Sequence, residues 1–122
     1  MYFLDSNIII YSVQPEHQYL RDYLRENELI ISKITLLEVL GYYKLTQQEK
    51  EDFSRLLENM KHVSISDEII SKAIQLRQSR KLSIGDSLIA ASAITSQAIL
   101  LTANVLDFEW IIELTTYNPI HK

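Results

Sequence analysis

The chain has 122 residues, 47% of them hydrophobic, and a formal net charge of −4, with a sequence pI of about 5.3. This length predicts a single domain over residues 1–122, because each of two domains would be too small to bury a core. The sequence has no cysteine, which excludes disulfides, thiolate metal sites and a cysteine nucleophile. An acidic chain is not typical of a general nucleic-acid coating protein, so contact with nucleic acid would need a local basic patch or a metal ion.

No targeting or membrane segment is predicted. The N-terminal apolar run has no basic region before it, unlike a signal peptide. No apolar stretch approaches the roughly 20 residues that a helix needs to span a bilayer. We therefore expect a soluble protein that acts in the cytoplasm and has no membrane partner.

The first half of the chain predicts two buried strands and several helices. A short apolar run closed by Asp5 indicates the first strand, and the Ile-rich run after it is ambiguous between strand and helix. Pro15 ends that run, and the next segments carry apolar residues at helical spacing. In chain order we predict a strand at 2–4, the ambiguous segment at 6–13, a helix at 16–26, a strand at 29–31, and helices at 34–45 and 46–60.

The second half predicts a parallel sheet that is covered on both faces. In chain order we predict a weak strand at 62–65, a helix at 67–80, a buried small-residue helix at 84–96, a strand at 99–101, a short helix at 105–110 and a last strand at 111–115. Strands that alternate with helices indicate an α/β fold with mainly parallel strands. We therefore expect a three-layer α/β/α sandwich around a central, mostly parallel sheet of four to five strands.

Four acidic residues stand where strands end or helices begin: Asp5, Glu38, Asp86 and Asp107. Ligands of open parallel sheets bind outside the carboxyl ends of the strands. Because these acids belong to four separate elements near such ends, the fold could bring them to one edge of the sheet. Carboxylates gathered there would repel each other unless a hard divalent cation offset their charge. The sequence therefore predicts an oxygen-ligand metal site at that edge.

Helix capping is the alternative explanation for these acids. Three segments match the capping-box pattern, in which Ser or Thr is followed three residues later by an acid: Thr35 to Glu38, Thr46 to Glu49, and Ser83 to Asp86. Asp5 could likewise be a plain N-cap. This alternative is weaker for Asp5 and Asp86, because strongly apolar residues surround both of them in the sequence.

Four motifs resemble those of PIN-domain ribonucleases, and specifically those of the VapC-type toxins of bacterial toxin–antitoxin pairs. The resemblance covers nearly the whole chain. It is carried by Leu4-Asp5-Ser6-Asn7-Ile8-Ile9-Ile10-Tyr11, by Glu38 in a helix after the second strand, by Gly85-Asp86-Ser87-Leu88-Ile89-Ala90-Ala91-Ser92-Ala93, and by Thr102-Ala103-Asn104-Val105-Leu106-Asp107-Phe108. The third string is the most specific of the four. One departure is Ala103, where relatives often carry a basic residue.

The resemblance implies a magnesium- or manganese-dependent endoribonuclease that hydrolyses RNA phosphodiester bonds. It implies that Asp5 and Asp86 bind the metal directly, and that Glu38 and Asp107 bind it directly or through water. Ser6 would bond a carboxylate or a substrate phosphate. Asn104 would orient Asp107 or a water molecule. The number of metal ions is left open.

The resemblance also implies three partners: an RNA substrate, a cognate protein antitoxin and a second copy of the chain. An arginine or lysine of the antitoxin could enter the acid cluster, because guanidinium meets carboxylates bidentately. An apolar helix of the antitoxin would lie in a groove on this chain. The segments at 40–45 and 46–60 are rich in apolar residues, so we expect them to contribute to a homodimer. Packing inside the protein is the alternative.

Basic and aromatic side chains give weaker signals. Arg77, Arg80 and Lys81 form the densest basic group, just before Asp86. They are either cations that complement a helix end or contacts for the RNA backbone. We expect Trp110 and the other aromatic residues to serve in the core or at an interface rather than as platforms for base stacking.

Three other functions fit these residues less well. A phospho-acceptor receiver domain has a similar length and architecture, and Asp67 and Thr102 fit it superficially. It needs an acidic pair after the first strand and a lysine after the last, whereas residues 111–117 contain no lysine. A haloacid-dehalogenase-type phosphatase would need an aspartate in place of Asn7. A catalytically inactive binding domain is disfavoured because all four acids are present.

Overall fold

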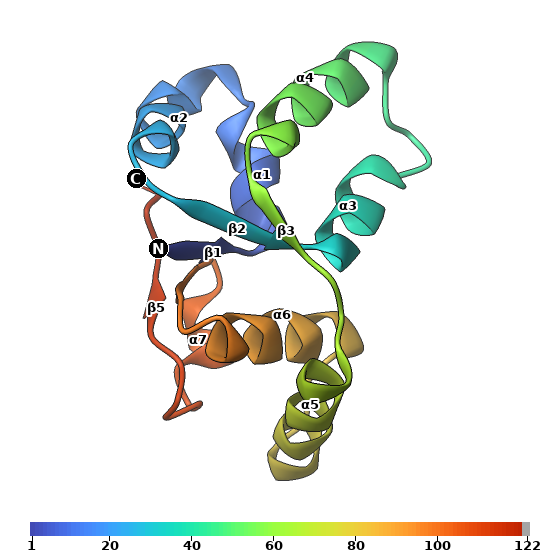
Figure 1. Cartoon of the computed structure of the whole chain (residues 1–122). Helices are drawn as coiled ribbons and strands as arrows, with labels where there is room; N and C mark the ends of the chain where they lie inside the picture. Colours follow the sequence, from blue (N-terminus) through green and yellow to red (C-terminus); the bar gives the residue numbers. More distant parts are fainter. Residues whose placement is uncertain (121–122) are drawn as a thin grey trace.

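The computed structural model describes residues 1–120, and its centre is a parallel sheet (Figure 1). Within these residues the sheet has five strands in the order β3-β2-β1-β4-β5, and every neighbouring pair is parallel. The strands are β1 (Tyr2–Leu4), β2 (Leu29–Ser32), β3 (Lys61–Val63), β4 (Ile99–Leu101) and β5 (Thr116–Tyr117). The α/β fold predicted from the sequence is confirmed.

Helices cover both faces of this sheet (Figure 1). One face carries α1 (Ser6–Ser12), α2 (Gln18–Arg25), α3 (Lys33–Leu40) and α4 (Gln47–Glu58), with a short 3₁₀ turn η1 (Pro15–His17) before α2. The other face carries α5 (Asp67–Ser79), α6 (Ile84–Thr95) and α7 (Val105–Phe108). The three-layer α/β/α arrangement is thus confirmed. None of the helices in residues 1–120 combines the length and the apolar composition that a membrane crossing requires.

The central strands are apolar on both sides because both faces of the sheet are buried. Successive side chains of a strand point to opposite faces. Phe3 and Leu100 pack with the residues of α5, α6 and α7, whereas their neighbours Leu4 and Leu101 pack with those of α1 to α4. This two-sided burial explains why the strands read as continuous hydrophobic runs rather than as alternating patterns.

The prediction of a last strand at 111–115 is wrong. Its apolar residues form tight turns that continue from α7. The Ile111 amide donates to the Phe108 carbonyl at 3.0 Å, and the Leu114 amide donates to the Ile111 carbonyl at 3.1 Å. Ile111 and Leu114 are buried, whereas Ile112 is 99% exposed, so the buried positions are three residues apart rather than two as in a strand. The final strand follows later, as β5.

Other boundaries also differ from the sequence predictions. The ambiguous segment at 6–13 is helical, as α1, and β3 begins and ends earlier than the predicted 62–65. Helix α3 ends at Leu40 rather than at 45. The Gly41 amide donates to the Leu37 carbonyl at 3.0 Å, and a Cβ at Gly41 would collide with that carbonyl oxygen. Glycine just past a helix end is a common stop signal, which the apolar residues after it had obscured.

The order of the strands changes direction between β1 and β4. The chain runs outward from β1 to β3 on one side and then crosses to β4 on the other side of β1. Helix α1 leaves β1 toward one face, while α7 leaves β4 toward the other (Figure 1). Ligands bind at such a change of direction, outside the carboxyl ends of the strands. Because Leu4 pairs with Leu101, the next residues, Asp5 and Thr102, stand side by side at this change of direction.

Candidate active site

Asp5 is the buried centre of the site. It follows β1 and is the N-cap of α1, and only 7% of its surface is exposed. Its Oδ1 accepts from the Ser6 amide at 2.8 Å. Its Oδ2 accepts from the Thr102 hydroxyl at 2.9 Å and from Asn7 Nδ2 at 3.3 Å. Residues that follow β1 and β4 therefore hold this carboxylate in one orientation.

The surroundings of Asp5 raise its pKa above the ordinary value. Burial is the largest cause, because it disfavours the charged form. The Thr102 bond lowers the pKa, the negative charge of Asp86 raises it, the Ser6 amide lowers it and the charge of Glu38 raises it further. The deprotonated carboxylate is therefore destabilised where it stands, and a nearby cation would relieve that strain.

Glu38 reaches the same edge from α3. Its Oε1 accepts from the Ser6 hydroxyl at 2.8 Å, so Ser6 contacts Asp5 with its amide and Glu38 with its side chain. The other oxygen, Oε2, faces the first turn of α6, because a Cβ built on Gly85 would lie 3.6 Å from it. Glu38 is exposed, so its carboxylate can change rotamer without disturbing the core.

Helix α6 presents Asp86 in its first turn. Residues 87–93 of this helix are buried, which fixes its start against the rest of the protein. The N-cap Ser83 accepts from the Asp86 amide at 3.0 Å through its Oγ. Asp86 is half-buried. Burial raises its pKa, the Ser83 hydroxyl lowers it and the charge of Asp107 raises it, and the net shift is upward.

Asp107 and Asn104 come from the segment after β4. The Asp107 amide donates to the Asn104 carbonyl at 3.0 Å, and the Asn104 amide donates to the Thr102 hydroxyl oxygen at 3.0 Å. The side chains of Asp107 and Asn104 are exposed. The structure therefore links Asn104 to Asp107 through the backbone, whereas the sequence predicted that its side chain would orient Asp107 or water.

Two polar residues that hold the site together were missed by sequence reasoning. Thr102 is fully buried and connects Asp5 with the segment that carries Asn104. Asn7 donates to Asp5, and its Oδ1 accepts from the Ala103 amide at 3.3 Å. The available signal was a hydroxyl directly after a buried strand. Its meaning depended on the pairing of β1 with β4, which the sequence does not reveal.

The structure brings the four acids to one edge of the sheet without closing them into a cage. Asp5 is affected by the charges of Asp86 and Glu38, and Asp86 by that of Asp107. Yet among residues 1–120, no three Asp, Glu or His side chains stand close enough together to hold one metal ion. The exposed Glu38 and Asp107 would have to turn inward to join Asp5 and Asp86.

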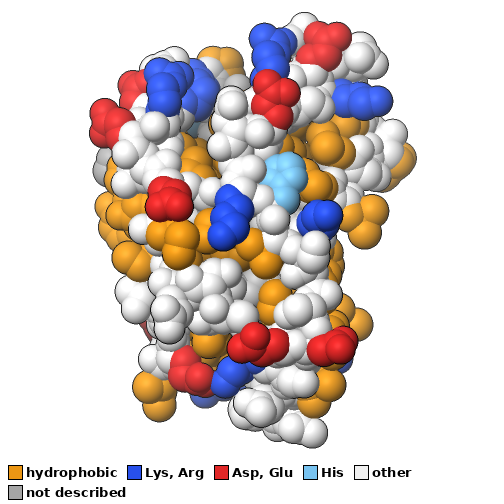
Figure 2. Space-filling view, in the orientation of Figure 1, with side chains coloured by type: hydrophobic (Ala, Val, Ile, Leu, Met, Phe, Trp, Pro, Cys, Tyr) orange, Lys and Arg blue, Asp and Glu red, His pale blue; other side chains and the backbone are white. Residues whose placement is uncertain are grey.

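The predicted basic group is divided between two positions. Arg77 Nε donates to the Leu82 carbonyl at 3.0 Å and so holds the loop between α5 and α6. Arg80 and Lys81 instead line a hollow of about 350 Å³ beside the acids of α6 and α7. On the face shown in Figure 2, basic and acidic side chains are interspersed, so that face offers no broad basic surface.

Fold and site together define an α/β protein with an acidic, oxygen-donor site at the change of strand direction in a parallel sheet. The sequence matches the PIN domain family over residues 2–107, and the chain belongs to this family. A comparison with curated protein sequences gave no significant match.

Several solved structures resemble this chain over nearly its whole length. It is 26% identical to a chain of a toxin–antitoxin complex from Klebsiella pneumoniae, with a TM-score of 0.79 and 100% of both chains covered. It is 26% identical to a chain of VapBC2 from Rickettsia felis bound to a promoter DNA fragment, with a TM-score of 0.83 and coverage of 96% and 97%. It is 25% identical to a chain of VapBC-1 from nontypeable Haemophilus influenzae, with a TM-score of 0.79 and 96% of both chains covered. The predicted resemblance to VapC-type PIN proteins is confirmed.

The receiver-domain alternative is not favoured. Asp67, the residue that would accept the phosphoryl group, opens α5 beyond the edge strand β3. Strand β2 separates β3 from β1, so Asp67 lies away from the end of β1 where Asp5 stands. A receiver domain would need its acidic pair and its acceptor at one site, and this fold does not supply that arrangement.

Proposed function

We propose that this PIN-domain protein is the endoribonuclease toxin of a toxin–antitoxin pair. It hydrolyses RNA with magnesium or manganese bound at the acidic edge, the edge of the sheet that carries Asp5, Glu38, Asp86 and Asp107. The observation that carries the proposal is the pair of Asp5 and Asp86, because burial and like charge raise the pKa of Asp5. Burying like charges does not stabilise a fold, so a cation is the natural partner of this pair. The similarity to a chain of a toxin–antitoxin complex supports the same function.

The residues at this edge fit magnesium or manganese. The donors are carboxylate oxygens, which hard divalent cations prefer. Magnesium usually keeps several waters and takes one or two protein carboxylates, so Asp5 and Asp86 would be its direct ligands. Glu38 and Asp107 would bind directly or through water, since both side chains are exposed and can turn. When bound, the metal would neutralise charge on the phosphoryl oxygens and promote attack of water on phosphorus.

The neighbouring polar residues position the carboxylates for this chemistry. Ser6 holds Glu38 over the start of α6, and Asn104 supports the turn that presents Asp107. Among the basic residues, Arg80 and Lys81 line the hollow beside the acids, so they are the ones that would contact RNA. Arg77 contributes less directly, because its Nε is engaged by the loop between α5 and α6.

An inhibitory protein partner follows from this function. A nuclease that cuts cellular RNA would damage the cell that produces it unless a cognate antitoxin blocked it. We propose that an arginine or lysine of the antitoxin enters the acidic edge and pairs with Asp5 or Asp86 in place of the metal. Guanidinium suits this role because it binds carboxylates bidentately.

We also propose a homodimer, through fewer residues than the sequence predicted. The apolar residues of α4, Phe53 and Leu57, are buried in the chain's own core. Exposed apolar side chains remain near the end of α3, where Leu37 is 72% and Tyr43 is 84% exposed. Leu37→Asp should weaken the dimer in light scattering at high micromolar concentration, whereas Ile112→Asp, at a fully exposed residue elsewhere, should not. A wild-type monomer would contradict the proposal.

The ribonuclease function is tested with the purified protein. RNA should be cleaved with magnesium or manganese and left intact with a chelator, and Asp5→Asn should remove most of the activity. The matched control is Asp67→Asn, which removes one carboxylate at a helix start outside the acidic edge and should leave the activity unchanged. Circular dichroism should show that both variants are folded. Full activity in chelator or in Asp5→Asn would contradict the mechanism.

The toxin function is tested in cells. Expression of the wild-type chain alone should arrest growth, whereas Asp5→Asn should not. Co-expression of the neighbouring gene product should restore growth, and the two proteins should purify together. Arrest that persists with Asp5→Asn, or a neighbour that neither binds nor rescues, would show that the chain is not a toxin of this kind.

A further inference from the structure

A hollow of about 350 Å³ lies beside the acidic edge and combines charge with an aromatic ring. One wall comes from the loop between α5 and α6, with Arg80 and Lys81. The other comes from α7 and from Trp110, which follows that helix. Asp86 and Asp107 belong to the same lining, so whatever occupies the hollow is adjacent to the proposed reaction site. Its volume falls within the roughly 300–1,000 Å³ of small-ligand pockets.

Trp110 is held in a fixed position at this hollow. Its indole is half-buried and packs against the core cluster below the sheet. The indole Nε1 donates to the Asp107 carbonyl at 2.9 Å, so the ring is bonded to the same residue whose side chain belongs to the acidic edge. The sequence predicted a core or interface role for Trp110. The structure gives it a core side and a second side that faces the hollow.

Arg80 lies over this ring instead of pairing with an acid. The guanidinium carbon is 5.1 Å from the centroid of the Trp110 ring, which is within the range of a cation–π contact. Neither Arg80 nor Lys81 forms an ion pair within residues 1–120, although two carboxylates line the same hollow. Arg80 is the C-cap of α5, and its guanidinium lies against the ring.

A planar cation over an indole, with a second cation beside it, matches the chemistry of an unpaired nucleotide. Single-stranded nucleic acids are held by stacking bases on aromatic rings and guanidinium planes, while cations contact the phosphates. Arg80 is exposed, so its side chain can lift from the indole and close over the other face of an entering base. A protein partner would be recognised by shape and apolar contact, whereas this hollow offers one ring between charged groups.

We propose that Trp110 and Arg80 form a stacking subsite for the unpaired base next to the scissile phosphate, with Lys81 contacting the flanking phosphate. This inference rests on the proposed ribonuclease function. It adds which part of the RNA the chain recognises, namely the unpaired base next to the scissile phosphate. It also separates binding in the hollow from chemistry at Asp5 and Asp86.

Trp110 is the single tryptophan of the chain, so its fluorescence reports directly on the subsite. Asp5→Asn protein, which should not cleave, is titrated with a short single-stranded RNA while total binding is followed by anisotropy of a labelled RNA. Binding should quench the tryptophan emission. The same RNA carrying an abasic site at one position should bind without quenching, and duplex RNA should quench little.

Variants separate the ring from the charge. Trp110→Leu keeps an apolar side chain but no ring, and Arg80→Lys keeps the charge but no plane. Each should raise the Kd for single-stranded RNA by about 5- to 150-fold, the usual range for one stacked base, and Trp110→Phe should have a smaller effect. Arg25→Ala, at an exposed arginine on α2, is the matched control and should change nothing.

The outcomes distinguish this inference from the proposed function. If wild-type protein cleaves RNA while Trp110→Leu and Arg80→Lys bind and cleave it equally well, the subsite is wrong and the ribonuclease function stands. Unchanged tryptophan emission at saturating RNA would overturn the subsite in the same way. If wild-type protein neither binds nor cleaves RNA, both are wrong. Trp110→Leu that fails to fold leaves Arg80→Lys and the abasic RNA to decide.

Discussion

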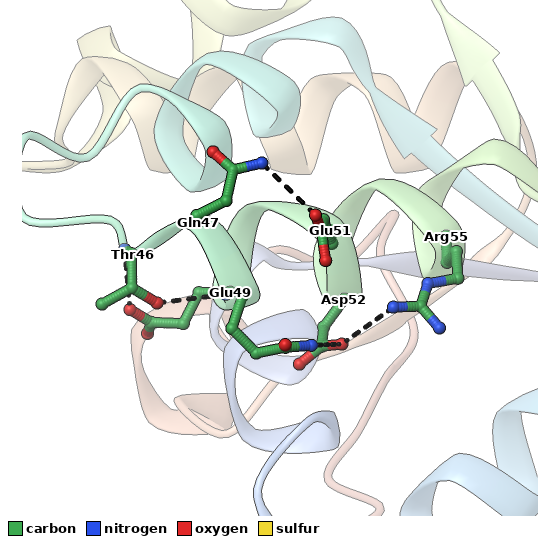
Figure 3. A network of polar contacts seen from close by, with 7 residues as sticks. Thr46, Gln47, Glu49, Glu51, Asp52 and Arg55 are labelled. Atoms are coloured by element: carbon green, nitrogen blue, oxygen red, sulfur yellow. Dashed lines mark hydrogen bonds and ion pairs between the residues drawn. The ribbon is translucent and has the colours of Figure 1, made fainter.

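The starts of α4 and α6 share one sequence pattern but use its acid differently. At α4, Thr46 accepts from the Glu49 amide at 3.1 Å, and Glu49 accepts from the Thr46 amide at 3.0 Å (Figure 3). At α6, Ser83 accepts from the Asp86 amide at 3.0 Å, but the structure of residues 1–120 shows no return bond that would complete a capping box. The acid of α4 completes a capping box, whereas the acid of α6 does not and instead feels the Ser83 hydroxyl and the charge of Asp107.

Location explains the difference between the two helix starts. The first turn of α4 is exposed, and its polar side chains pair along the helix surface (Figure 3). The first turn of α6 lies at the carboxyl edge of the sheet, where burial and the charge of Asp107 raise the pKa of Asp86. A carboxylate that is not used by a cap and is held near other acids is a stronger functional candidate than the pattern alone.

The largest expected effect comes from comparing the neutralisation of Asp86 at the start of α6 with that of Glu49 at the start of α4. Asp86→Asn should lower ribonuclease activity by more than the roughly 10- to 100-fold that a residue supporting a metal ligand contributes, because it removes a ligand charge. Glu49→Gln makes the same change in charge at α4 and should leave the activity unchanged. The measurement is the rate of RNA cleavage at saturating magnesium. Equal activity in the two variants would mean that Asp86 is only a cap residue.

Ser6→Ala should have the next largest effect. It removes the hydroxyl that holds Glu38 and should reduce activity by about 10- to 100-fold, as expected for a group that positions a ligand. Ser66→Ala is the control, because Ser66 caps α5 through a bond to the Ile69 amide and lies outside the acidic edge. Cleavage is measured over a range of magnesium concentrations. Ser6→Ala should need more magnesium than wild type for half of its maximal activity, because Glu38 is less well positioned, whereas Ser66→Ala should not. Activity lost equally in both variants would point to a general loss of stability.

The metal-free protein should become less stable as pH rises. The pKa values of Asp5 and Asp86 are raised above their ordinary value of 3.8, so the folded state binds more protons than the unfolded state at pH values just above it. Their contribution is present below about pH 4 and is lost as pH rises through the folded pKa values. In chelator, Asp86→Asn should therefore gain stability over wild type at about pH 7.5 but not at about pH 4.

Magnesium should reverse this loss in the wild-type protein. A ligand present at about 100 times its Kd stabilises the folded state by about 2.7 kcal/mol. Urea denaturation at neutral pH, with and without magnesium, measures the gain, and Asp86→Asn should show much less of it. Equal stabilisation of both proteins by magnesium would place the binding site elsewhere.

The architecture was accessible from the sequence because it depends on local signals. Alternating apolar runs and amphipathic segments predicted the layers, and most element boundaries fell within a few residues. The errors arose where apolar content was taken for regular structure. Residues 111–115 bury every third side chain in turns, and the helix at α3 stops at Gly41 although apolar residues follow it.

Of the candidate site, only the set of four acids could be predicted from the sequence. Their place beyond strand ends could be predicted, but their bonding partners depend on strand pairing. Thr102 reaches Asp5 because β4 pairs with β1, and nothing in the local sequence specifies that pair. The capping-box match from Thr35 to Glu38 is wrong for a related reason. Ser32, not Thr35, is the N-cap of α3, which leaves Glu38 in the helix interior and directed to Ser6.

The smallest expected effect concerns the cap of α4. Thr46→Ala removes an N-cap side chain and should lower the free energy of unfolding by about 1 kcal/mol while leaving ribonuclease activity unchanged. Ser83→Ala removes the equivalent oxygen at α6 and should cost a similar amount of stability, but it should also reduce activity, because the Asp86 amide loses its partner and the carboxylate its support. Urea denaturation and cleavage rates on the same preparations compare the two. If both variants lose stability and neither loses activity, the start of α6 is an ordinary helix cap like that of α4.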